Sequence, residues 1–175
     1  MTEDALSPDK LDTLRSAMES YFIDEKWESA LFITLGAIAI VVGFLLWKNG
    51  SSYKTAAYPL VIIALIQIAV GAAVYQRSDA QLSGLYQQAG EAPAQYRADE
   101  SARMDKVQTS FKLYKALELL LLVAGIGLCL GYRDTMSLYA AGVGLLAQSA
   151  LLLVLDLIAE KRADFYVAAI RDAFG

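Results

Sequence analysis

The sequence contains no histidine, and its only cysteine is Cys129. The absence of histidine excludes the sites that depend on imidazole, namely Ser-His and Cys-His catalytic pairs and His-ligated zinc or haem. A single cysteine also excludes an intramolecular disulfide and a CxxC site. No Gly-rich phosphate loop, HExxH, acidic calcium loop or Ser-x-x-Lys motif is present. We therefore expect a protein that is not an enzyme and that needs no cofactor or metal.

Charged residues are also scarce. They make up 19% of the chain, below the roughly 25% of an average soluble domain. Fifteen Lys and Arg stand against nineteen Asp and Glu, a net charge of −4. Because nucleic-acid binding requires a basic surface that neutralises phosphates, we expect no nucleic-acid partner.

Hydrophobic residues make up 57% of the sequence and are concentrated in four long runs. Each run is long enough to cross a bilayer, which takes roughly 20 helical residues. Trp27 and Trp47 flank the first run, as amphipathic rings do at the two membrane interfaces. A soluble bundle with buried helices is the alternative, but these runs lack the polar stripe of a surface helix. The predicted membrane spans are Glu28–Trp47, Ala56–Tyr75, Leu113–Gly131 and Met136–Ile158.

Four spans place both termini and the middle loop on one side of the membrane. That side holds twelve Lys and Arg residues, and the two short connections on the other side hold three. The positive-inside rule then places both termini in the cytoplasm, and in a bacterium the membrane is the inner membrane.

The segments outside the spans are predicted to be helical as well. Residues 1–27 form an amphipathic helix that begins at Ser7-Pro8 and ends near Ile23, where Asp24 caps the first span. Its acidic polar face favours packing on protein over packing on anionic lipid. Residues 77–112 form a helical hairpin that turns at Gly90–Pro93, with Asp99 capping its second helix. Residues 159–175 continue the last span.

Together these segments predict an all-α integral membrane four-helix bundle. It consists of two tandem hairpins, residues 28–76 and 113–158, whose helices extend into a small cytoplasmic bundle. Laying Tyr58–Tyr75 over Tyr139–Asp156, at an offset of 81 residues, aligns Tyr58 with Tyr139 and Gln67 with Gln148. This weak repeat suggests a parallel duplication of the hairpin.

Four polar residues within the predicted spans are candidates for a functional role. Gln67 and Gln148 lie near the span centres, where an unpaired amide is costly, so we expect these side chains to face inward and to form interhelical hydrogen bonds. The alternative is a polar ring that lines a path. Glu118 and Asp156 lie nearer the cytoplasmic side, and we interpret them as ion-paired with neighbouring lysines and arginines. A proton-relay or ion-binding role is the alternative for this pair.

Small residues recur along all four spans and indicate close helix packing within the bundle or against another copy. The candidate packing glycines are Gly36, Gly43, Gly71, Gly127, Gly131 and Gly144.

These features favour a non-enzymatic inner-membrane protein that acts by binding another protein, such as a subunit of a membrane complex or an immunity protein against a membrane-acting toxin. The alternative is a small homo-oligomeric channel or transporter with a polar path at Gln67 and Gln148. The expected partners are the lipid bilayer and either another protein or further copies of the chain.

Overall fold

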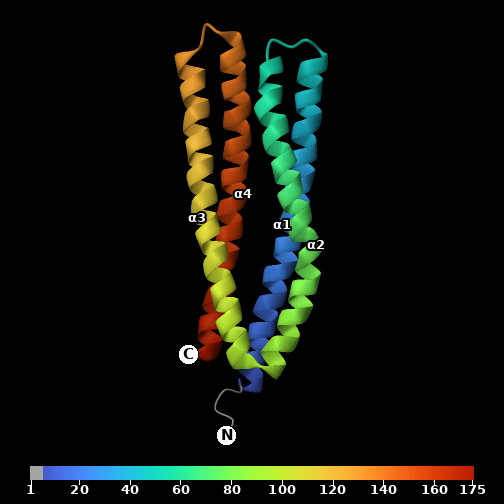
Figure 1. The fold of residues 1–175 in the computed structure, drawn as a ribbon, viewed down its shortest axis with the longest axis vertical. Coiled ribbons are helices and arrows are strands. Elements are labelled where there is room, and N and C mark those ends of the chain that lie inside the picture. Colours follow the sequence, from blue (N-terminus) through green and yellow to red (C-terminus); the bar gives the residue numbers. More distant parts are fainter. Residues whose placement is uncertain (1–5) are drawn as a thin grey trace.

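The computed structural model describes residues 6–175, so the first five residues of the predicted N-terminal segment lie outside it. Four long helices and one 3-10 turn make up the described chain: α1 (Pro8–Lys48), η1 (Lys54–Ala56), α2 (Ala57–Glu91), α3 (Pro93–Gly131) and α4 (Met136–Phe174). The helices form two antiparallel hairpins, α1 with α2 and α3 with α4 (Figure 1). The prediction of an all-α chain with four long helices is confirmed.

The helix boundaries follow from local backbone chemistry. Pro8 and Pro93 stand in the first turns of α1 and α3, where a proline ring fits and its missing N–H is not needed. A residue before proline avoids the helical region, and Ala92 accordingly has φ −143° and ψ 68° and separates α2 from α3. The predicted helix start at Asp99 is wrong, because Pro93 already begins α3 and Asp99 lies inside it.

The predicted corner near Ile23 is also wrong, since α1 runs without interruption from Pro8 to Lys48. Asp24 has the chemistry of a cap, but neither glycine nor proline occurs nearby to end the helix. The continuous helix also directs the side chain of Glu25 inward, where it accepts hydrogen bonds from Tyr21 (3.4 Å) and from Ser78 of α2 (2.9 Å). The predicted first span and the segment before it are therefore one continuous helix.

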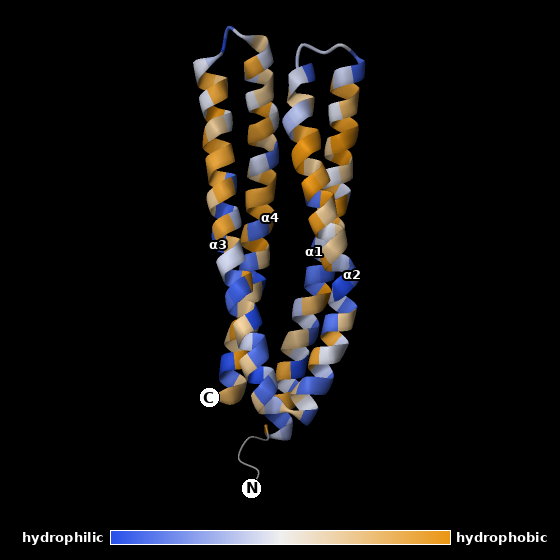
Figure 2. Ribbon diagram, viewed as in Figure 1, coloured by the Kyte–Doolittle hydropathy of each residue, from blue (hydrophilic) through white to orange (hydrophobic). Residues whose placement is uncertain are grey.

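The helices have 41, 35, 39 and 39 residues, so each is about 50–60 Å long at about 1.5 Å per residue. Hydropathy divides their length into two zones (Figure 2). All the exposed large apolar side chains of the described residues lie within residues 23–75 and 113–165. We call this zone the apolar segment, and we call residues 8–22, 76–112 and 166–174 the base. Both described chain ends lie at the base (Figure 1).

All four helices contribute to one hydrophobic core in the base. Its buried members in the base are Leu14, Met18, Tyr21 and Phe22 of α1, Ala89 of α2, Tyr96 and Met104 of α3, and Tyr166, Ile170 and Ala173 of α4; Ala163 extends it into the end of the apolar segment. The rings of Tyr21 and Tyr166 stack with their centroids 4.7 Å apart, which joins the first helix to the last. The base therefore buries its apolar residues within the chain itself.

The two hairpins also meet in the apolar segment. At the end opposite the base, Thr55 Oγ1 donates a hydrogen bond to the carbonyl oxygen of Ser137 (2.6 Å). Nearby, Ala56, Leu60 and Ala140 form one buried cluster. The contacts between the hairpins thus extend from the base to the far end of the molecule.

Candidate functional site

Gln67 and Gln148 face each other across the boundary between the hairpins. Gln148 Nε2 donates to Gln67 Oε1 at 2.6 Å, and Gln67 Nε2 donates to the carbonyl oxygen of Phe32 on α1 at 2.8 Å. Each glutamine is only 2% exposed. The interhelical hydrogen bond that the sequence predicts is therefore present, and it links three helices.

This arrangement determines what the two amides can do. Hydrogen bonds between side chains in an apolar interior fix the register of helices because the alternative is an unsatisfied polar group. Gln67 uses both its oxygen and its nitrogen within the bundle. As placed in one chain, the pair joins helices and does not line an open path.

Glu118 of α3 and Asp156 of α4 are also brought close together. Both side chains are buried, and Glu118 Oε2 has no hydrogen-bond partner. The predicted ion pairs for these acids are wrong. Lys115 instead pairs with Glu160 (2.6 Å), and Arg162 pairs with Glu28.

The reason for this difference is that the cations pair with acids on other helices. Lys115 of α3 binds an acid of α4, and Arg162 of α4 binds an acid of α1. Sequence spacing shows which acids lie near a cation on the same helix face. It does not show whether the cation pairs with one of these or with an acid on another helix. The result is a buried pair of carboxyl groups beside the Lys115–Glu160 ion pair. The described residues contain no group of three or more residues that could hold a metal ion.

Four of the six candidate packing glycines lie in tight contacts. A Cβ added at Gly36 would come within 2.7 Å of Ile68 Cγ1, and one at Gly144 within 2.6 Å of the carbonyl oxygen of Ala56. Gly43 and Gly71 lie in similarly close contacts between α1 and α2.

The GxxxG motif of α3 is different. A Cβ at Gly127 or Gly131 would meet no atom within 4 Å. The glycines that bring α3 and α4 together are Gly125 and Gly142, neither of which is among the six candidates predicted from the sequence. Gly142 lies two residues before Gly144 on α4. Gly142 packs against α3 and Gly144 packs against η1, so the small residues of this helix contact two different elements.

A second polar network in the base was not found from the sequence. The hydroxyl groups of Tyr96 and Tyr166 are 2.8 Å apart. Arg103 forms a bidentate ion pair with Glu100, in which Nε and Nη2 each lie 2.7 Å from a carboxylate oxygen. Burial is the main cause that raises the pKa of both tyrosines above their ordinary value. The only sequence signal was the helical spacing of large side chains, which indicates a core without identifying hydroxyl pairs.

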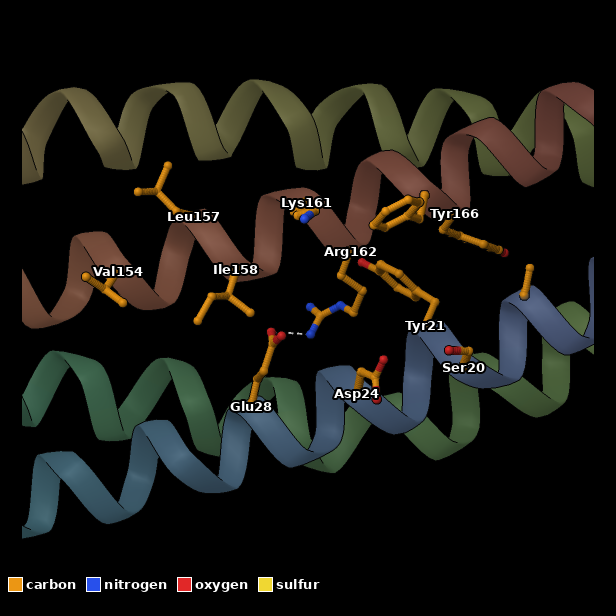
Figure 3. A pocket seen from close by; sticks show the side chains of 12 residues that line it. Ser20, Tyr21, Asp24, Glu28, Val154, Leu157, Ile158, Lys161, Arg162 and Tyr166 are labelled. Atoms are coloured by element: carbon orange, nitrogen blue, oxygen red, sulfur yellow. Dashed lines mark hydrogen bonds and ion pairs between the residues drawn. The ribbon is translucent and has the colours of Figure 1, made fainter.

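A cleft lies between α1 and α4, where the apolar segment meets the base (Figure 3). Its volume is about 860 Å³. Asp24 and Glu28 line it from α1, and Leu157, Ile158 and Arg162 line it from α4. Figure 3 shows Arg162 reaching across the cleft to Glu28.

No protein-family model, curated protein or solved structure matches this chain, so the geometry itself carries the functional argument.

Proposed function

We propose that the protein is a multi-pass inner-membrane protein with a cytoplasmic base, and that it acts by binding another protein and not by catalysis. The observation that carries this proposal is the distribution of exposed large apolar side chains. They cover the apolar segment on all four helices and are absent from the described surface of the base. Contact between such a surface and lipid carries no hydrophobic free-energy cost, whereas its exposure to water does.

Aromatic side chains support the placement of the membrane. Trp27, Tyr75 and Tyr114 are exposed where the apolar segment meets the base, and Trp47 and Tyr132 are exposed at its other end. Trp and Tyr favour the two headgroup levels of a bilayer. The spacing of these two groups along the helices matches one membrane thickness, since about 20 residues separate Trp27 from Trp47.

The orientation is supported by the basic residues. Twelve of fifteen Lys and Arg lie on the side that holds the base, which favours a cytoplasmic base. Cysteine labelling in a Cys129→Ser background tests this orientation. An impermeant maleimide should label Asn49→Cys in intact cells, and it should label Gln87→Cys only after permeabilisation. The reverse pattern would refute the orientation.

The binding proposal rests on the surface of the base. Asp9, Asp12 and Ser16 are exposed on one face of α1, while the apolar face of this helix is buried in the core of the base. A packed cytoplasmic bundle with an acidic face suits a partner protein that presents basic residues. Such a partner is compatible with either a membrane complex or a toxin that the protein neutralises.

A pair of matched variants tests the binding proposal. Asp12→Lys/Ser16→Lys reverses the charge of the α1 face, and Asp105→Lys/Thr109→Lys makes the same change on exposed positions of α3. We expect cross-linking in native membranes to capture a partner with the wild type and with the α3 variant but not with the α1 variant. Equal capture by all three proteins would contradict a role for the α1 face.

A homo-oligomeric channel with a path at Gln67 and Gln148 is the less supported alternative, because these amides are buried and bonded within one chain. Ion flux into liposomes that is lost in Gln67→Leu/Gln148→Leu would favour the channel over our proposal.

A further inference from the structure

The cleft between α1 and α4 has an ordered lining. Along α4, from the apolar segment toward the base, the aliphatic Val154, Leu157 and Ile158 come first and the cationic Lys161 and Arg162 follow. The three aliphatic side chains are each about half exposed. This sequence, hydrocarbon followed by positive charge at the boundary of the apolar segment, is the order in which a phospholipid of the same leaflet presents its acyl chains and its phosphate.

The cations of the cleft retain donors for an anion. Lys161 forms no ion pair with any described residue, and its ammonium lies 5.9 Å from the centre of the Phe165 ring. Arg162 donates from Nη1 to Glu28, and its Nε is buried without a hydrogen-bond partner. A guanidinium carries five N–H donors, so Arg162 can bind a phosphate oxygen while it keeps Glu28.

The acids of the cleft select the headgroup. Asp24 and Glu28 line the α1 side, opposite Lys161 and Arg162, so the cleft has two charges of each sign. An anionic headgroup would place uncompensated negative charge near Asp24. A headgroup that carries both a phosphate and an ammonium matches the two sides.

We propose that this cleft binds a zwitterionic glycerophospholipid of the cytoplasmic leaflet, with its phosphate at Lys161 and Arg162, its ammonium at Asp24 and an acyl chain along Leu157 and Ile158. The inference rests on the proposed membrane location of the apolar segment. The cleft volume of about 860 Å³ lies within the range of sites that enclose small organic ligands. Phosphatidylethanolamine has the required chemistry, because its primary ammonium can donate hydrogen bonds to a carboxylate.

Native mass spectrometry of the full chain, released from nanodiscs of equal parts phosphatidylethanolamine, phosphatidylglycerol and phosphatidylcholine, tests the site. We expect the wild type to retain phosphatidylethanolamine in preference to the other two lipids. Lys161→Gln should reduce its retention about tenfold, the effect of one charge-assisted hydrogen bond. Arg77→Gln removes the same charge at an exposed position of α2 outside the cleft and should retain the lipid as the wild type does. Asp24→Asn should abolish the preference for phosphatidylethanolamine over phosphatidylglycerol.

Failure of the lipid site and failure of the proposed membrane location give different outcomes. If the protein incorporates into nanodiscs but Lys161→Gln and Arg77→Gln retain the lipid equally, the site is refuted and the membrane location stands. Failure to incorporate into nanodiscs refutes the membrane location itself. A photo-crosslinker at Leu157 should label lipid. Labelling of a partner protein in its place would assign the cleft to a protein and overturn the lipid site.

Discussion

At the scale of single residues, several buried polar side chains of this protein form hydrogen bonds across helices. Gln67 bonds to Gln148 and to Phe32, Ser78 bonds to Glu25, and the hydroxyls of Tyr96 and Tyr166 bond to each other. Each bond contributes little net free energy, but an unpaired partner in an apolar interior is costly. Replacing both partners of a bond should therefore cost less than the sum of the two single substitutions.

Gln148→Leu alone should lower the free energy of unfolding by about 1–3 kcal/mol, because it leaves Gln67 Oε1 without a donor. In Gln67→Leu/Gln148→Leu the loss should be smaller than the sum of the two single losses, with a coupling of about 0.6–1.7 kcal/mol. A double-mutant cycle of unfolding in detergent measures this coupling. Strict additivity would contradict a direct bond between the two amides.

The buried tyrosines of the base predict a dependence on alkaline pH. Burial is the main cause that raises the pKa of Tyr96 and Tyr166, so the folded state keeps these protons at a pH where the unfolded chain loses them. Their contribution to stability is fully present below about pH 10, the ordinary tyrosine pKa, and is lost as the pH rises above it. We expect the free energy of unfolding, measured by denaturant titration, to fall above pH 10.

Tyr166→Phe provides the control for this pH effect. It should lower stability at neutral pH by about 1–3 kcal/mol, because Tyr96 loses its hydroxyl partner. It should also flatten the decline above pH 10, since one of the two late-titrating groups is gone. An unchanged alkaline decline would show that other groups cause it.

At the scale of helices, close packing depends on which glycines face a neighbour, and this is only partly visible in the sequence. The four long helices, their apolar runs and the interhelical hydrogen bonding of the two inward-facing glutamines could be predicted, because periodicity, run length and the cost of a lone amide are local properties. The continuity of α1 at Ile23 and the partners of Glu118 and Asp156 could not. They depend on donors and cations supplied by other helices, such as the Ser78 hydroxyl that donates to Glu25.

Gly144 and Gly127 give a matched test of helix packing. Gly144→Ala would place a Cβ 2.6 Å from the carbonyl oxygen of Ala56, which is backbone and cannot move cheaply. We expect a loss of about 1–3 kcal/mol from overpacking. Gly127→Ala meets no atom within 4 Å, so it should be neutral or stabilise the helix by up to about 1 kcal/mol. Both effects can be read from unfolding in detergent, and equal losses would contradict the packing described.

At the scale of the whole molecule, the protein is two hairpins that are joined mainly through α4. This helix contacts α1 at the stacked rings of Tyr21 and Tyr166, α2 at Gln148, and η1 at Gly144. Each hairpin also has an extensive contact between its own two helices. In a bilayer, hairpins of this kind can insert first and associate afterwards, because insertion and helix packing are separable steps.

This architecture predicts that the chain can be divided at its tightest turn. Residues 1–92 and 93–175, produced together as two polypeptides, should each insert as a hairpin and co-purify through a tag on either one. Tyr21→Ala/Tyr166→Ala removes the stacked rings that join the two halves in the base, and it should sharply reduce co-purification while leaving both fragments in the membrane. Tyr75→Ala/Tyr114→Ala removes the same amount of ring surface at exposed positions and should leave co-purification unchanged. If neither fragment accumulates without a covalent link, the hairpins are not independent units and the whole bundle folds as one.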